Sequence, residues 1–257
     1  VYAVSQDAVL IRYYRSHRYL KAAIFACGTY SRNYFHFLFE VLPRAAAAES
    51  MAPLDVPIVT DGGMPVQHYQ ALKLLFPTRE IIQLDPQTEY EVGTLYVASA
   101  PCLVHDAFGS DRAPADSVRY HPAVVDYLNG ASFPFHTGAT SRKLFLRRDG
   151  AYRKLLNIDE LQERLVKLGY EVIDCELLSF SEQVSLFSQA SSIVAPTGAH
   201  LANIVFCRPG TSIFPLFSDA PATNFYLWSK LGEMIDLKVV NIVGKRSYKA
   251  EGPGLPA

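Results

Sequence analysis

Residues 143–217 alternate between strand and helix signals without a break, and this alternation constrains the fold more than any other feature of the chain. Short apolar runs at residues 143–146, 192–195 and 211–217 predict strands, and helical patterns lie between them. Strands that alternate with helices of this length predict right-handed crossovers and a parallel sheet. The fold class predicted from this stretch is therefore α/β.

Local signals place the helices of this stretch. Ser179 followed by Glu182 has the form of a capping box, and Asn157 followed by Glu160 resembles one. Gly169 is placed to end the first of these two helices. Between the helices, residues 170–175 predict a buried strand. A turn at residues 208–210 leads into the strand at 211–217, and residues 238–243 predict a last strand.

The first half of the chain repeats this alternation. Asn33 and Pro65 stand where an N-cap and a first-turn proline open helices. A polar loop follows over residues 99–117, then a helix over 121–129 that Gly130 stops, and then a linker over 131–141. We place the domain boundary in this linker, which gives domains at residues 1–135 and 136–257. Strands are predicted at residues 22–26, 56–60, 81–84 and 94–98.

Two turns of the second half are suited to phosphate. The strand at 143–146 ends in Arg147 and Arg148, and the strand at 192–195 runs into Pro196, Thr197 and Gly198. In parallel α/β sheets ligands bind beyond the carboxyl ends of the strands. A helix that begins after Gly198 would offer unpaired backbone N–H groups, and arginine offers bidentate donors. The alternative for Arg147 and Arg148 is that they are surface charges on a strand end. The alternative for the turn at Gly198 is that its small residues serve packing only.

A third candidate lies on the helix that begins near Asn33. Asn33, His36, Glu40 and Arg44 follow one another at steps of three, four and four, so in an α-helix they share one face. A histidine and a glutamate one turn apart are a base and its orienting partner. The alternative is a solvated stripe on an amphipathic helix. The spacing alone leaves both interpretations of this helix open. His200 has two interpretations as well: it either belongs to a site or serves helix capping and packing.

Composition and absent motifs narrow the function. The formal net charge of −1 predicts no general affinity for nucleic acid. Four scattered cysteines suggest neither a zinc site nor a disulfide framework. No apolar run is long enough to span a bilayer. The sequence contains no Asp-x-Asp, G-x-S-x-G, P-loop or H-E-x-x-H motif, which disfavours the common hydrolase and kinase classes.

At these residues the sequence resembles family 61 glycosyltransferases. One block is Asn33-Tyr-Phe-His-Phe-Leu-Phe-Glu-Val-Leu-Pro-Arg44, close to the family pattern Asn-Tyr-x-His-Trp-x-x-Glu-x-Leu-Pro-Arg. The other block runs from Leu146-Arg-Arg-Asp149 through Asn157 and Leu178-Ser-Phe-Ser-Glu-Gln183 to Pro196-Thr-Gly-Ala-His-Leu-Ala-Asn203 and Pro209-Gly-Thr211. The resemblance implies a GT-B architecture, in which two Rossmann-like domains face a cleft, and transfer with inversion and without a metal or another cofactor.

The resemblance also implies roles for residues. His36 would be the base and Glu40 its orienting partner, with His105 or Asp106 as the rival base. Asn33, Arg44, His105 and Asp106 would lie on the acceptor side. The nucleotide-sugar donor would be bound in the second domain by Arg147, Arg148, Asn157, Glu182, Thr197, Gly198, Ala199 and His200.

Two positions depart from the family pattern, and both fall on the donor side. The family usually has His-Gly-Ala where this chain has Thr197-Gly198-Ala199, and Pro215 stands where a glutamate is common. The leading hypothesis is a bacterial glycosyltransferase of polysaccharide biosynthesis. Its donor would be a nucleotide sugar, in the first instance a UDP-sugar, and its acceptor a glycan or a lipid-linked glycan. The enzyme would act in the cytoplasm near the membrane. The competing hypotheses are a catalytically silent sugar-nucleotide or glycan-binding module and a sugar-nucleotide epimerase.

Overall fold

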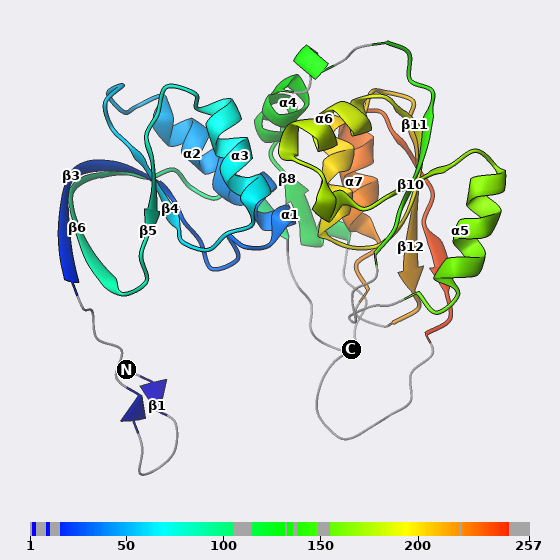
Figure 1. The fold of residues 1–257 in the computed structure, drawn as a ribbon, viewed down its shortest axis with the longest axis horizontal. Helices are drawn as coiled ribbons and strands as arrows, with labels where there is room; N and C mark the ends of the chain where they lie inside the picture. Colours follow the sequence, from blue (N-terminus) through cyan, green and yellow to red (C-terminus); the bar gives the residue numbers. More distant parts are fainter. Residues whose placement is uncertain are drawn as a thin grey trace. The chain divides into compact units, whose positions relative to one another are not determined.

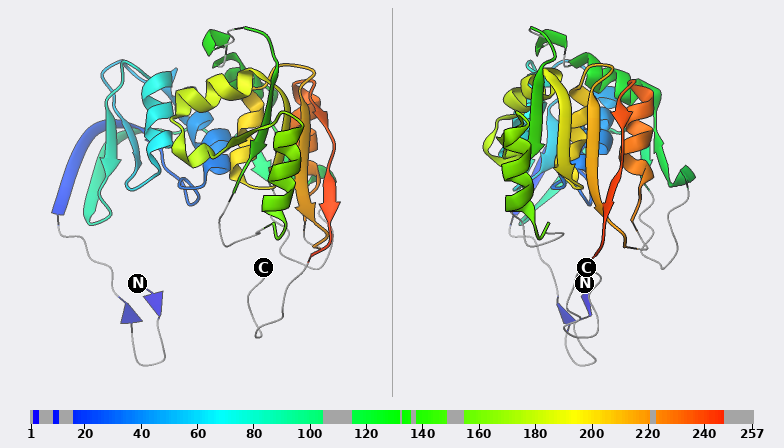
Figure 2. Two further views of the ribbon diagram at one scale, coloured as in Figure 1. Left: turned by 45° about the vertical axis from the view of Figure 1, so that its right-hand side comes forward. Right: turned by 90° about the vertical axis from the view of Figure 1, so that its right-hand side faces the viewer.

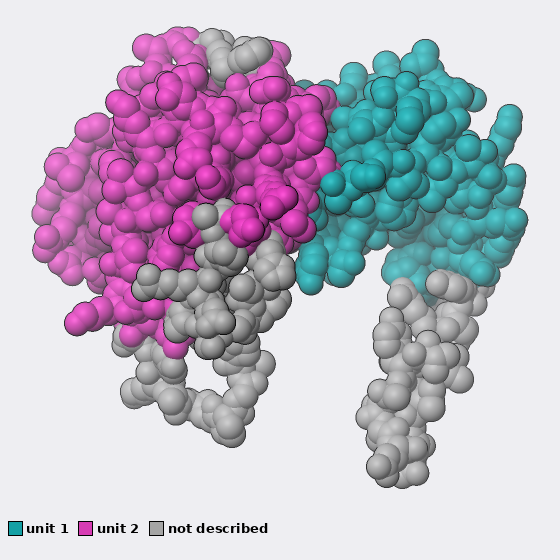
Figure 3. All heavy atoms as spheres, turned by 180° about the vertical axis from the view of Figure 1, so that it is seen from behind, with its two compact units in different colours: residues 1–32, 40–100 teal, residues 33–39, 101–257 magenta. Residues whose placement is uncertain are grey.

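The structure is a computed structural model that describes residues 2–3, 9–10, 16–104, 115–131, 133–135, 138–148, 155–220 and 223–246. The chain divides into two compact units (Figure 3). The first unit holds residues 1–32 and 40–100, and the second holds residues 33–39 and 101–257. Each unit contains a parallel sheet of its own, which confirms the predicted α/β class.

The first unit is built on a four-stranded parallel sheet with the order β5-β4-β3-β6 (Figure 1). Its strands are β3 (Ser16–Ala26), β4 (Ile58–Asp61), β5 (Ile81–Leu84) and β6 (Thr88–Tyr96). Helix α2 (Leu42–Glu49) precedes β4, and helix α3 (Val66–Leu75) connects β4 to β5. A short antiparallel pair, β1 (Tyr2–Ala3) and β2 (Val9–Leu10), comes before the sheet. Leu20, Ala23, Cys27, Val59 and Ile82 form one cluster of its core.

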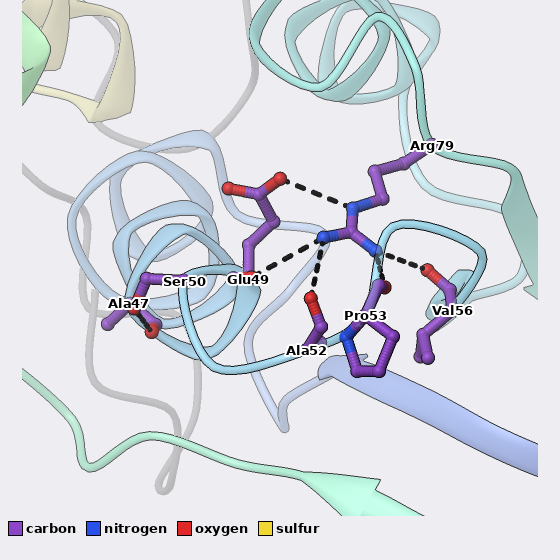
Figure 4. Close-up of polar contacts among 7 residues, drawn as sticks. All are labelled: Ala47, Glu49, Ser50, Ala52, Pro53, Val56 and Arg79. Carbon is purple, nitrogen blue, oxygen red and sulfur yellow. Dashed lines mark hydrogen bonds and ion pairs between the residues drawn. The ribbon is translucent and has the colours of Figure 1, made fainter.

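A buried arginine fixes the loop that leaves α2 (Figure 4). The side chain of Arg79 is 1% exposed, and its Nε donates to the Glu49 carboxylate at 3.2 Å. Its two Nη atoms donate to the backbone carbonyls of Glu49, Ala52, Pro53 and Val56. A buried guanidinium is tolerated only when its donors are satisfied, so this network holds the connection from α2 to β4 in one conformation.

The second unit contains a six-stranded parallel sheet. The path along it is β10-β9-β11-β12-β13, and β14 also pairs with β12. The strands are β9 (Arg142–Leu146), β10 (Glu171–Ile173), β11 (Ala190–Pro196), β12 (Ser212–Ser218), β13 (Lys238–Val239) and β14 (Ile242–Gly244). Numbered from β9, the first five strands have the spatial order 2-1-3-4-5, which is a doubly wound topology with its switch point between β9 and β11.

Helices cover both faces of this sheet (Figures 1 and 2). Helix α5 (Ile158–Lys167) follows β9 and packs on one face, where Ile158 and Leu165 contact Phe145 and Val194. The chain then crosses to the other side of β9, so right-handed crossovers place the later helices on the opposite face. These later helices are α6 (Phe180–Ser188), the 3₁₀ helix η5 (Ala199–Phe206) and α7 (Tyr226–Met234). Helix α4 (Pro122–Ala131) precedes β9 and contacts η5 and α7 on the same side.

Several predicted elements differ in the structure. The helix predicted after Gly198 is present as a 3₁₀ helix, whereas the following elements depart from the prediction. Strand β10 was expected to be buried, but it lies at the edge of the sheet and is largely exposed. The loop predicted over residues 99–117 contains β7 (Cys102–Val104), which pairs with β8 (Val118–Tyr120), and the short helix η2 (Ala115–Ser117). Gly130 lies inside α4 instead of stopping it, and part of the linker forms η3 (Phe133–Phe135).

The last predicted strand is split in two by a proline in its neighbour. Pro215 in β12 pairs with Ala195 on one side. On the other side, β12 pairs with β13 as far as Ile213 and with β14 only from Leu216 onward. A proline has no N–H to donate to a neighbouring strand, so the ladder is interrupted where Pro215 stands.

The two packing units divide near residue 100. Segment 115–131 belongs to the second unit, where Tyr120 Oη donates to the Leu227 carbonyl at 3.0 Å and Asn129 Nδ2 donates to the Val205 carbonyl at 2.8 Å. The division into domains at residues 1–135 and 136–257, with acceptor-side and donor-side roles, stays a prediction. None of the helices in the described ranges is long and apolar enough to cross a bilayer.

Candidate functional site

The switch point of the second sheet brings together the two turns that the sequence singled out. Arg147 and Arg148 follow the carboxyl end of β9, and Thr197 and Gly198 follow the carboxyl end of β11. These strands are neighbours in the sheet, with Ile193 opposite Leu144 and Val194 opposite Phe145. In doubly wound sheets ligands bind in the crevice outside these two strand ends. The candidate site of the second unit is therefore formed by these two turns.

Arg148, Gly198 and His200 are in close contact at this point. A Cβ atom placed on Gly198 would lie 3.1 Å from Arg148 Nη1 and 3.0 Å from His200 Cε1. Both distances are shorter than ordinary van der Waals contacts, so the absence of a side chain at Gly198 lets the guanidinium and the imidazole approach the backbone. The resulting cluster presents one permanent cation and one imidazole at the switch point.

His200 is uncharged in this setting. Burial, and after it the nearby positive charge of Arg148, lower the pKa of His200 to about 4, against smaller opposing effects of the Pro196 backbone and Asp174. Its Nε2 atom is buried and has no hydrogen-bond partner among the described residues. A neutral imidazole with a buried, unpartnered nitrogen can exchange a hydrogen bond with a ligand without adding charge.

Arg147 points to a different partner from its neighbour. Its Nη1 donates to the Asp159 carboxylate at 2.9 Å and to Gln162 Oε1 at 2.8 Å, and both residues lie on α5. Successive residues at a strand end point to opposite faces of the sheet, and α5 covers one of those faces. The structure thus places Arg148, and not Arg147, beside Gly198.

The other predicted donor-side residues differ in their contacts. Thr197 Oγ1 accepts from Trp228 Nε1 at 3.1 Å, so its side chain faces α7. Glu182 completes the predicted capping box, because its carboxylate accepts from Ser179 N at 2.8 Å while Ser179 Oγ accepts from Glu182 N. Asn157 precedes α5 but makes no capping bond within the described part of the chain, which contradicts the cap predicted there. Ala199 begins η5.

The helix at Asn33 forms as predicted but changes its period. Asn33 Oδ1 accepts from Phe35 N at 3.0 Å, which confirms the predicted N-cap. After α1 (Tyr34–His36) the chain makes a π-helical segment, η1 (Phe37–Val41), before α2. Pro43 explains the wide turn: it has no N–H, and its ring would clash with the carbonyl of residue 39 in a regular helix. The shared face expected for His36, Glu40 and Arg44 assumed an unbroken 3.6-residue period, which this segment does not keep.

The residues of this helix are divided between the two units. Asn33 and His36 belong to the second unit, and Glu40 and Arg44 belong to the first. Arg44 has a structural partner set: its Nε donates to the Glu40 carbonyl at 3.0 Å and its Nη2 to the Cys27 carbonyl at 2.8 Å. The pairing of His36 with Glu40 stays a prediction. His105 and Asp106 lie outside the described residues.

Sequence reasoning missed a chain of buried side-chain amides. Tyr34 Oη donates to Asn203 Oδ1 at 2.6 Å, and Asn203 Nδ2 donates to Gln183 Oε1 at 2.7 Å. Gln183 Nε2 then donates to the carbonyls of Cys175 and Leu178. Burial raises the pKa of Tyr34 well above its ordinary value, so the hydroxyl keeps the proton that it donates. The signal available was the position of Tyr34, Gln183 and Asn203 within the motif segments.

Aromatic packing holds the same helix in the second unit. Phe35 lies edge-on to Trp228, with ring centroids 5.9 Å apart, and also edge-on to His36 at 5.4 Å. Phe39 packs against Tyr120 with centroids 5.0 Å apart. Because Trp228 also donates to Thr197, the His36 helix and the turn at Gly198 share one supporting residue. This connection could not be read from the sequence.

The family follows from a comparison with known proteins. The model of the family described as glycosyltransferase 61 matches residues 34–214, more than half of the 257 residues. The chain belongs to the glycosyltransferase 61 family. It is therefore a glycosyltransferase, which transfers a sugar from a donor to a glycan acceptor. No curated protein matches the chain.

The matched range of this glycosyltransferase includes both parts of the candidate site. It begins at Tyr34, within the helix that carries His36, and it runs through β9, β11 and η5 into β12. The described residues contain no group of three or more His, Cys, Asp or Glu side chains that could hold a metal ion. In the described part of the second unit, the charge beside Gly198 is supplied by Arg148.

Proposed function

We propose that this glycosyltransferase is a metal-independent, inverting enzyme that moves a sugar from a nucleotide sugar, in the first instance a UDP-sugar, to a glycan hydroxyl. The donor diphosphate would bind at the switch point of the second sheet. The observation that carries the proposal is the position of the Arg148 guanidinium beside Gly198 and His200.

The chemistry of the leaving group explains why this arrangement suits a diphosphate. As the glycosidic bond to the nucleotide breaks, the departing phosphate gains negative charge. A fixed guanidinium and backbone N–H groups stabilise that charge in the transition state. Because burial keeps His200 neutral, Arg148 is the group of this cluster that supplies positive charge to the anion. The lack of an Asp-x-Asp motif in the sequence supports the metal-independent form of this mechanism.

Inversion requires a base on the opposite side of the sugar from the leaving group. We assign this role to His36, with Glu40 as the residue that orients it. The base takes the proton of the acceptor hydroxyl while the oxygen attacks the anomeric carbon in line with the departing phosphate. His105 or Asp106 is the alternative base. Asn33 and Arg44 are assigned to the acceptor side.

The proposal extends to architecture and setting. Two units, each with a parallel sheet, support a GT-B arrangement of two Rossmann-like domains facing a cleft. We place the enzyme in the cytoplasm near the membrane of a bacterium, where lipid-linked glycans of polysaccharide biosynthesis serve as acceptors.

A second candidate function is a sugar-nucleotide or glycan-binding module without turnover. The observation that favours it is the Thr197 side chain, which stands where the family usually has histidine and which accepts a hydrogen bond from Trp228. A threonine engaged in packing contributes no charge to the donor site.

The test is a calorimetric screen of UDP, GDP, CMP and their common sugar conjugates in the presence of EDTA, followed by turnover with glycan acceptors. Saturable binding that EDTA does not weaken, together with acceptor-dependent nucleotide release and an inverted anomeric product by NMR, is the expected result. Binding without turnover would select the silent module. Binding that requires a divalent metal, or retention of the anomeric configuration, would refute the mechanism.

A further inference from the structure

The first unit has a pocket at the carboxyl edge of its own sheet. The pocket has a volume of about 300 Å³ and lies where β3, β4 and β5 end. Gly28 follows β3, Asp61 ends β4 with Gly62 after it, and Leu84 ends β5 with Pro86 after it. The volume is at the lower end of the range for small-molecule sites, about 300–1,000 Å³, and fits a ligand the size of one sugar ring.

Two opposite charges line this pocket, and each is held by backbone rather than by the other. Asp61 Oδ2 accepts from Gly28 N at 2.9 Å. Arg32 Nη2 donates to the Gly62 carbonyl at 3.3 Å. The ion pairs found among the described residues do not include a pair between Asp61 and Arg32. A carboxylate and a guanidinium therefore line one pocket as separate acceptor and donor groups.

The turn after β4, which carries Asp61, is braced. Tyr69 Oη donates to the Asp61 carbonyl at 2.9 Å and accepts from Met64 N at 3.1 Å. A Cβ on Gly62 would lie 2.5 Å from the Leu84 carbonyl oxygen, so the turn after β4 packs directly on the end of β5. A site whose polar groups are fixed before the ligand arrives binds with a smaller entropy cost.

The lining matches a neutral sugar better than it matches a phosphate or a nucleobase. A sugar hydroxyl both donates and accepts, so neighbouring hydroxyls can donate to Asp61 and accept from Arg32. The carbon-bound hydrogens of the ring can pack against Leu84 and Pro86. A phosphate would be repelled by Asp61, because like charges at close range are unfavourable. A base would find no aromatic residue among those that line the pocket.

We infer that this pocket binds an uncharged sugar ring of the acceptor glycan, with Asp61 accepting from its hydroxyls and Arg32 donating to them. The assignment to the acceptor rests on the proposed function, since a transferase needs a glycan site apart from the donor site. The binding of a neutral sugar at these residues is a separate claim, and it can be measured without turnover.

The experiment is an amide NMR titration of the full chain with uncharged methyl glycosides of glucose, galactose, mannose and xylose, with methyl glucuronide and inorganic phosphate as charged probes. We expect saturable shifts of the Gly28 and Gly62 amides with at least one uncharged glycoside. Asp61→Asn keeps the shape and the acceptor for Gly28 N but removes the charge, and it should weaken binding about 10-fold, the scale of one charged hydrogen bond. Arg32→Gln should have a similar effect.

Matched controls are Glu89→Gln and Arg18→Gln, exposed changes on β6 and β3 that should leave the affinity unchanged. No saturable shift with any uncharged glycoside, unchanged affinity in Asp61→Asn and Arg32→Gln, or phosphate as the preferred ligand would each overturn the inference. The donor screen reports on Arg148 and the second unit. Sugar binding in the NMR titration together with no binding in the donor screen would therefore support the sugar site and refute the proposed function. Donor binding without sugar binding would support the proposed function and refute the sugar site.

Discussion

Arg147 and Arg148 are adjacent in the sequence and should differ sharply in their contribution to catalysis. Arg148 Nη1 lies beside Gly198, whereas Arg147 Nη1 is bound to Asp159 and Gln162 on α5. The comparison is between Arg148→Gln and Arg147→Gln, which remove the same charge from neighbouring positions. Each variant is the matched control of the other.

The magnitude follows from the role assigned to each side chain. Loss of one donor aimed at the developing charge costs about 100-fold or more in turnover, which corresponds to about 2.7 kcal/mol of transition-state stabilisation. We expect this loss for Arg148→Gln in both kcat and kcat/KM. The Arg147 partner Asp159 is 82% exposed, so Arg147→Gln should cost at most about 1 kcal/mol of stability and change turnover only a few-fold.

The assay is steady-state nucleotide release with donor and acceptor, and the pKa of His200 provides a second measurement. The Arg148 charge helps to lower that pKa, after the larger effect of burial. NMR titration of the imidazole should therefore show a pKa of about 4 in the wild type, a higher value in Arg148→Gln and little change in Arg147→Gln. Equal losses of turnover in the two variants, or a His200 titration that ignores Arg148, would refute the placement of Arg148.

Three further outcomes are expected. Arg79→Met should lower the free energy of unfolding, measured by urea denaturation, by about 3 kcal/mol. The substitution leaves the Glu49 carboxylate and four backbone carbonyls without their shared buried donor. An unchanged denaturation midpoint would contradict the stabilising role of the Arg79 network in Figure 4. Tyr34→Phe should cost about 1–3 kcal/mol in the same assay, since buried Asn203 loses its donor. Burial lowers the pKa of fully buried His68 to about 4 from 6.5, so the unfolded chain binds more protons between these values. Stability should fall as the pH drops from about 6.5 to about 4, and His68→Gln should flatten that part of the curve.

The sequence was sufficient for the topology of the second unit because its signals are local. Strand and helix patterns, the capping box at Ser179 and the turn at Gly210 each depend on a few neighbouring residues. A parallel sheet then follows from the alternation, and the edge at which ligands bind follows from the sheet. The convergence of Arg148 and Gly198 was predictable in this way.

The remaining differences depend on contacts between distant residues. The direction of the Arg147 side chain is decided by which face of the sheet α5 covers, and the break between β13 and β14 is decided by Pro215 on another strand. The π-helical segment required attention to Pro43, whose effect reaches back four residues to the preceding turn. Asp61 was missed because a single carboxylate at a strand end has no distinctive pattern in the sequence.

The hydrogen-bonded chain of Tyr34, Asn203 and Gln183 bears on what a family signature records. These three residues come from three of the separate segments by which the sequence resembles its family, and they are hydrogen-bonded to one another inside the second unit. Part of the family signature therefore consists of residues that stabilise the fold of this unit. A chain that had lost catalysis would still need these residues to fold. Membership can be recognised from these segments, while the rate of sugar transfer is expected to depend on side chains outside this hydrogen-bonded chain, for which we propose Arg148 and His200.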